Sequence, residues 1–215
     1  MKSVLLKDLY NLRTSSGYML IVMLVFAVAF LPMGYLNFLF MGGVVFSVMV
    51  VNTFSYDEYA KWNCYALSMP IQKRDIVMGK FLLTLLLSAL GILLGGIGST
   101  IGGILLKQLT PADRQAWNML LCCIEIGFCF AVLLGTTMIP LLFRFGVEKA
   151  RLITLGTVAV PILAFFAFYK IPGVRNLFVD GRAFPVLMIV LPFFVLIWGF
   201  GMYHISCRIF HKKEF

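Results

Sequence analysis

The sequence predicts an all-α integral membrane protein, and two observations carry this prediction. Hydrophobic residues make up 61% of the 215 residues and charged residues only 13%, whereas a soluble domain has roughly 45–50% and about 25%. The apolar residues also form long uninterrupted runs, and a bilayer admits such runs only as helices of about 20 residues that close their own backbone hydrogen bonds. These features exclude a single water-soluble domain.

Six apolar stretches are long enough to cross a bilayer. They predict six transmembrane helices in a single membrane domain over residues 1–215, at residues 17–35, 36–54, 77–106, 117–143, 152–169 and 184–207. Because Pro32 and Gly34 supply the only turn chemistry between the first two spans, we expect a tight hairpin there. Residues 1–16 place Leu5, Leu9 and Leu12 on one helical face, which predicts an amphipathic helix along the membrane interface.

The basic residues predict how the chain is oriented. Thirteen of the 18 Lys and Arg residues lie in segments 1–16, 55–80, 144–151 and 208–215, which an even number of spans places on one side. The cytoplasmic side collects Lys and Arg, so we expect a multi-pass protein of the cytoplasmic membrane with both termini in the cytoplasm. The net charge of +9 lies beside apolar runs, which favours contact with anionic lipid over nucleic acid.

The longest polar interruption, residues 55–80, separates the second and third spans. Ser55 and Glu58 have the spacing of a capping box, and Asp57 and Lys61 have the spacing of a helical ion pair. A proline disfavours helix in the residue before it, so the helical turns should end at Pro70. The pattern predicts a short cytoplasmic helix that begins at Ser55.

Trp62, Tyr65 and Met69 follow one another at helical spacing in this segment. One interpretation is an aromatic stripe that docks into a groove of another protein. The other is an interfacial helix with an aromatic belt and snorkelling lysines, which is common in membrane proteins. The spacing alone leaves both open.

The same segment resembles the cytoplasmic segment of ABC-2 type permeases, the small six-span membrane subunits of ABC exporters. The family pattern is an acidic residue, a Lys-Trp pair, a Leu-x-x-Pro-like turn, basic residues and a lysine that opens the next helix. The matching residues are Asp57, Glu58, Lys61, Trp62, Leu67, Met69, Pro70, Lys73, Arg74 and Lys80. Lys7-Asp8-Leu9 with Arg13 also looks like the interfacial elbow helix of that family, here within residues 1–16.

The resemblance implies that residues 55–76 form a coupling helix that binds a groove on a separate ATP-binding subunit. It further implies a second permease protomer, as a homodimer or a heterodimer, and places ATP and Mg²⁺ in the partner, with no cofactor, metal or catalytic residue in this chain. No G-x-x-x-x-G-K-[ST] phosphate loop occurs in the sequence, in keeping with a motor on another chain. The short external loops favour export of an amphipathic peptide or a hydrophobic compound.

Glu125 is a carboxylate near the middle of the fourth predicted span, where an unpaired charge costs at least about 2.5–3.5 kcal/mol. One hypothesis gives it a place on the transport path or a proton-linked role, which would suit a proton-coupled secondary transporter or channel. The other is a hydrogen bond to a neighbouring span. Candidate partners are Asn52, Ser88, Ser99 and Thr100.

Several other residues have mainly structural interpretations. Gly91 and Gly95 have the G-x-x-x-G spacing that lets helix backbones approach closely. His204 and His211 lie near the predicted cytoplasmic end, where an interfacial position is favoured over a metal site. A second charged cluster has two interpretations, another contact with the motor or a solvated loop, and consists of Arg144, Glu148 and Arg151.

Overall fold

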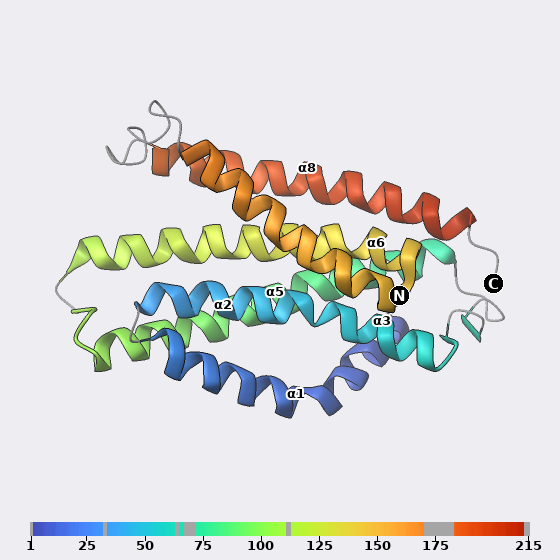
Figure 1. Ribbon diagram of the computed structural model, residues 1–215, viewed down its shortest axis with the longest axis horizontal. Coiled ribbons are helices and arrows are strands. Elements are labelled where there is room, and N and C mark those ends of the chain that lie inside the picture. Colours follow the sequence, from blue (N-terminus) through green and yellow to red (C-terminus); the bar gives the residue numbers. More distant parts are fainter. Residues whose placement is uncertain are drawn as a thin grey trace.

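The computed structural model describes residues 2–31, 34–62, 65–66, 72–110, 113–169 and 183–212. Within these residues the chain is helical and contains no strand, as predicted. The helices are α1 (Lys2–Phe30), α2 (Tyr35–Val48), α3 (Val50–Tyr59), α5 (Lys73–Leu105), α6 (Arg114–Tyr169) and α8 (Ala183–Lys212), and they run side by side along the long axis of the molecule (Figure 1).

Four helical stretches are long and apolar enough to cross a membrane, at Tyr35–Tyr59, Lys73–Leu105, Arg114–Lys149 and Met188–Lys212. They correspond to four of the six predicted spans. In α1 the apolar helix Leu20–Phe30 is shorter than a span, and residues 152–169 are helical but their side chains lie mostly outside the described part. Four described helices therefore have the length and composition of membrane spans, and the predicted number of six is not confirmed.

The structure changes three of the predicted boundaries. The amphipathic segment and the first predicted span lie in one continuous helix, α1. The second predicted span continues through Met49 into α3, so its helix runs on past residue 54 to Tyr59. In α6 a break occurs at Gly146, whose φ of 74° and ψ of 174° are not helical, and the predicted charged loop 144–151 reduces to this sharp bend between two helical parts.

Glycines let α2 and α5 pack against each other closely. A Cβ atom at Gly42 would lie 2.7 Å from the Gly91 carbonyl oxygen and 3.0 Å from the Gly95 Cα. These distances leave no room for a side chain, so the predicted role of Gly91-x-x-x-Gly95 in helix packing is confirmed. Between α1 and α2 the turn also falls where predicted, at Gly34, which has a φ of 142°.

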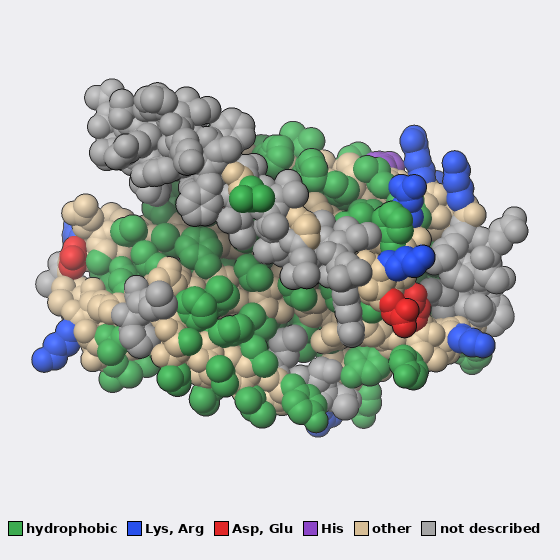
Figure 2. All heavy atoms as spheres, in the orientation of Figure 1, with side chains coloured by type: hydrophobic (Ala, Val, Ile, Leu, Met, Phe, Trp, Pro, Cys, Tyr) green, Lys and Arg blue, Asp and Glu red, His purple; other side chains and the backbone are tan. Residues whose placement is uncertain are grey.

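The start of α1 and the end of α8 lie at the same end of the bundle, beside the end of α3, the start of α5 and the bend in α6 (Figure 1). Hydrophobic side chains cover the middle of the molecule, and lysine and arginine side chains gather at its ends (Figure 2). This arrangement matches the predicted grouping of the basic segments. That this end faces the cytoplasm stays a prediction.

Candidate functional site

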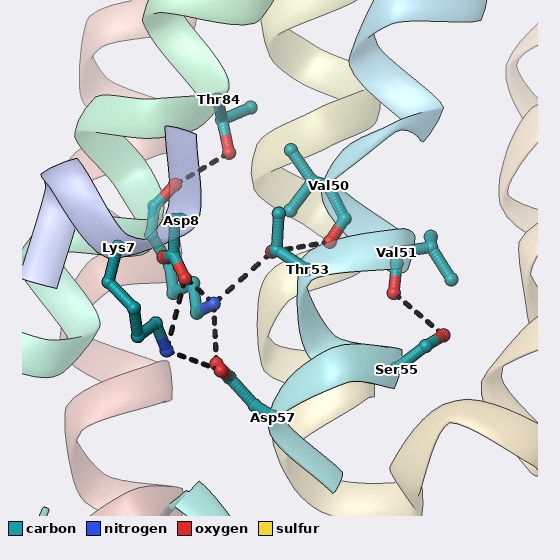
Figure 3. A network of polar contacts seen from close by, with 9 residues as sticks. Lys7, Asp8, Val50, Val51, Thr53, Ser55, Asp57 and Thr84 are labelled. Carbon is teal, nitrogen blue, oxygen red and sulfur yellow. Dashed lines mark hydrogen bonds and ion pairs between the residues drawn. The ribbon is translucent and has the colours of Figure 1, made fainter. Parts of the chain in front are cut away.

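Four charged side chains from three helices form a closed ring at the end of the bundle that holds the start of α1 and the end of α8. Lys7 and Asp8 come from the first turns of α1, Asp57 from the last turn of α3 and Lys80 from the third turn of α5. Each carboxylate gives one oxygen to each ammonium group. We call these four residues the ionic ring (Figure 3).

Each of the two lysines in the ring contacts both carboxylates. Lys80 Nζ lies 2.9 Å from Asp8 Oδ2 and 2.6 Å from Asp57 Oδ2. Lys7 Nζ lies 3.2 Å from Asp8 Oδ1 and also contacts Asp57 Oδ1. Lys80 additionally donates a hydrogen bond to Thr53 Oγ1 at 3.2 Å, whereas the Asp8 oxygens form ion pairs without hydrogen-bond geometry.

Burial distinguishes an inner pair from an outer pair. The side chains of Asp8 and Lys80 are 0% and 1% exposed, and we call them the inner pair. Those of Lys7 and Asp57 are 20% and 5% exposed, and we call them the outer pair. Two positive and two negative groups balance, which matters because a buried ion left without its counter-ion is strongly destabilising. The ring therefore specifies which ends of α1, α3 and α5 meet.

Trp62 covers the outer side of the ring. Lys7 Nζ lies 4.3 Å from the centroid of the indole, a cation–π geometry. Trp62 is partly buried against the main hydrophobic core, and its buried Nε1 has no hydrogen-bond partner within the described ranges. The Trp62 and Tyr65 rings are 5.7 Å apart, but Tyr65 is 57% exposed and so faces outward. The predicted stripe is thus divided, with Trp62 turned inward, and Met69 lies outside the described residues.

Glu58 connects α3 to the bend in α6. The Val147 N–H donates to Glu58 Oε2 at 3.1 Å, at the N-terminus of the second helical part of α6, where free N–H groups favour a negative charge. A Cβ atom at Gly146 would lie 2.6 Å from Glu58 Oε1, so the contact requires glycine there. The predicted capping box is wrong. Ser55 lies inside α3, where its hydroxyl donates to the Val51 carbonyl oxygen, and Glu58 caps a different helix.

The end of α3 is thus joined to three other helices by charged side chains. Comparison with known families identifies the family to which the chain belongs. The profile of a family described as ABC-2 family transporter protein matches residues 3–211. The chain belongs to the ABC-2 transporter family. Searches of curated proteins and of solved structures returned no match.

Family membership confirms the resemblance seen in the polar segment, but the local structure of this ABC-2 protein differs from two predictions. Asp57 pairs with Lys7 and Lys80, and the predicted Asp57–Lys61 pair is wrong. The reason is that α3 ends at Tyr59 and Lys61 has a φ of 47°, which takes its side chain off the helix face. The same turn means that no single helix runs on from Ser55.

The remaining residues of the predicted coupling segment are placed only in part. Lys73 Nζ donates to the His211 carbonyl oxygen at 3.5 Å, which joins the start of α5 to the end of α8. Arg74 is exposed beside it. Leu67, Met69 and Pro70 lie outside the described residues. Lys73 and Arg74 therefore belong to the same end of the bundle as the ionic ring. They lie next to α8 and not on the surface that carries Trp62 and Tyr65.

Glu125 lies on α6 and is partly exposed. In the part of the chain that the structure describes, its carboxylate makes no hydrogen bond or ion pair. Two predicted partners are committed to their own helix, since Ser99 donates to the Gly95 carbonyl and Thr100 to the Ile97 carbonyl. Ser88 is buried, and its hydroxyl has no hydrogen-bond partner among the residues that the structure describes. The predicted hydrogen bond from these three residues is absent.

The other charged and metal-ligating candidates stay structural. Arg144 and Glu148 are exposed on either side of Gly146, and the guanidinium of Arg144 lies 5.2 Å from the Phe145 ring centroid. The His204 ring packs edge-on against Phe200 at 4.5 Å between centroids. Among the described residues, no group of His, Cys, Asp and Glu side chains is arranged to hold a metal ion.

Sequence reasoning named every member of the ionic ring but did not assemble it. Lys7 and Asp8 were assigned to the interfacial helix, Asp57 to a local pair and Lys80 to the start of a span. One signal was available: Lys80 lies inside the predicted span 77–106, and a charge in that position requires a partner from a neighbouring helix. The sequence does not say which acidic residue supplies it.

Proposed function

We propose that this chain is the membrane-spanning permease subunit of an ABC exporter, driven by ATP hydrolysis in a separate ATP-binding subunit. The observation that carries this proposal is the connection of the α3 end to α1 and α5 through the ionic ring and to α6 through Glu58. A second permease protomer, alike or different, completes the transport path. The cargo is an amphipathic peptide or a hydrophobic compound, moved across the cytoplasmic membrane.

The connection suits transmission of movement from a partner. A ligand shifts a conformational equilibrium only by its difference in affinity for the two states, so an ATP-binding subunit must hold a part of this chain that differs between them. The segment after Tyr59 is such a part. Because α3 is joined to three helices, displacement of its end would be passed to all of them as rigid bodies.

The surface offered to the partner is aromatic and basic. Tyr59 is 95% exposed and Tyr65 57% exposed, and the exposed Lys61 lies between them in the sequence. Tyrosines supply large contact areas at interfaces and are often among the residues that dominate binding. We therefore assign the docking contact to Tyr59 and Tyr65, while Trp62 acts from the inner side.

The experiment that tests the proposal uses the purified chain in nanodiscs together with candidate ATP-binding subunits of the source cell. We expect one of them to bind and the Tyr59→Ala/Tyr65→Ala variant to weaken that binding at least about tenfold, as loss of two central interface aromatics does. The matched control is Tyr10→Ala, which removes a 70% exposed tyrosine of α1. Equal loss in the control, or full binding by the double variant, would place the contact elsewhere.

An alternative function rests on Glu125, whose carboxylate makes no hydrogen bond or ion pair within the described part of the chain. A proton-coupled secondary transporter or channel would use this group as its proton site and would need no ATP-binding subunit. Cargo movement by the Glu125→Gln variant decides between them. The ABC exporter proposal expects transport that still follows ATP hydrolysis in this variant, whereas the alternative expects transport to stop and its pH dependence to disappear.

A further inference from the structure

Trp62 is held by two contacts and leaves one polar group unsatisfied. The indole makes a cation–π contact with Lys7 and packs against the hydrophobic core, but its buried Nε1–H has no acceptor among the described residues. An unsatisfied buried donor costs free energy of the same order as the cation–π contact contributes. If Trp62 moved outward, water would satisfy the N–H, which offsets part of what the covered position gains.

The ionic ring beneath Trp62 has a fully buried inner pair and a more exposed outer pair. The inner pair, Asp8 and Lys80, is fully buried and joins α1 to α5. The outer pair, Lys7 and Asp57, is the more exposed one and joins α1 to α3 directly beneath the indole. Lys80 also holds Asp57 and Thr53, so α3 keeps its attachment to α5 when the outer pair separates.

We propose that Trp62 and the outer pair form a latch between the cytoplasmic segment and α1. In the closed state Trp62 covers Lys7, and Lys7 holds Asp57. In the open state Trp62 leaves, Lys7 separates from Asp57 and becomes hydrated, and Lys80 still holds both Asp8 of α1 and Asp57 of α3. The latch is a property of this chain alone and does not depend on which partner, if any, moves it.

The latch makes Lys7 and Trp62 positioning residues. The closed state fixes the direction in which the chain leaves α3, and therefore the placement of Tyr59 and Tyr65. The open state frees that surface from α1 without dismantling the bundle, because the packing of α2 on α5 involves other residues. The latch therefore lets the cytoplasmic end move without lowering the stability of the membrane part.

The test is solvent access to Trp62, measured as acrylamide quenching in a Trp117→Phe/Trp198→Phe background, where Trp62 is the sole tryptophan. Two charge-balanced variants are compared in nanodiscs. The outer variant is Lys7→Gln/Asp57→Asn, and the inner variant is Asp8→Asn/Lys80→Gln. Each removes one cation and one anion from the ring, and Lys61→Gln removes an exposed lysine next to Trp62 as a control.

We expect the outer variant to raise the open population about fivefold or more, the effect of losing one cation–π contact. The inner variant and Lys61→Gln should leave Trp62 shielded. Equal exposure in the outer and inner variants would show that the ring acts as one unit and would overturn the latch. A shielded Trp62 in the outer variant would show that Lys7 does not hold it, with the same consequence.

A second variant keeps the inference testable if the outer variant is not recovered as a folded protein. Trp62→Leu removes a partly buried side chain and leaves all four ring charges in place. Hydrogen exchange should then become faster at the end of α3 and in the first turns of α1, and stay unchanged in the part of α5 that packs on α2. Unchanged exchange at α1 and α3 would contradict the latch.

Discussion

Replacing Lys80 by glutamine should destabilise the protein strongly. The variant leaves the buried Asp8 and Asp57 to share one cation, Lys7. One buried negative charge is then left without its counter-ion, and removing one partner of a buried ion pair costs roughly 3–5 kcal/mol.

The assay is equilibrium unfolding in detergent micelles at pH 7, with Asp8→Asn/Lys80→Gln as the matched variant. The double variant restores one cation for one anion, since Lys7 and Asp57 remain paired, and it should recover most of the lost stability. If Lys80→Gln lay within about 1 kcal/mol of the parent protein at pH 7, the buried charges would not be coupled as described. A double variant no more stable than Lys80→Gln would contradict the reasoning equally.

Two further predictions concern the contacts around the ring. Glu58→Ala removes the acceptor of the Val147 N–H and should cost about 1 kcal/mol of stability, as loss of an N-cap does, with faster hydrogen exchange at Val147. Glu58→Gln keeps an acceptor oxygen and should lose less stability. Unchanged hydrogen exchange in Glu58→Ala would exclude the cap. Gly42→Ala should cost about 1–3 kcal/mol because its Cβ would meet the Gly91 carbonyl, while Gly199→Ala, which meets nothing within 4 Å, should melt like the parent protein. Equal melting temperatures for Gly42→Ala and Gly199→Ala would rule out the close α2–α5 contact.

The helices themselves could be predicted because their cause lies in the sequence. Long apolar runs must form helices in lipid, and the spacing of Gly91 and Gly95 alone predicts close helix packing. The turn at Gly34 was visible for the same reason. The bend at Gly146 could not be predicted. A loop of several charged residues and a sharp bend at one glycine with a positive φ have similar local sequences.

The candidate site could be predicted only as a list of residues. Local spacing rules assigned Ser55 to Glu58 and Asp57 to Lys61. The first assignment failed because Ser55 lies inside α3, and the second failed because Asp57 is needed elsewhere. Helix neighbours three and four positions apart contribute only about 0.2–0.5 kcal/mol per pair, whereas a buried lysine such as Lys80 requires a counter-ion at far greater cost. Tertiary pairing of distant residues therefore decided where Asp57 points.

The central claim is that a separate ATP-hydrolysing subunit moves this chain by its cytoplasmic end. The most direct measurement is ATP hydrolysis by the source cell's candidate ATP-binding subunits, each added alone to the purified chain in nanodiscs. We predict that one subunit changes its hydrolysis rate when the chain is present and returns to its own rate with the Tyr59→Ala/Tyr65→Ala variant. Cargo movement by the chain in vesicles free of any such subunit and of nucleotide would contradict the claim.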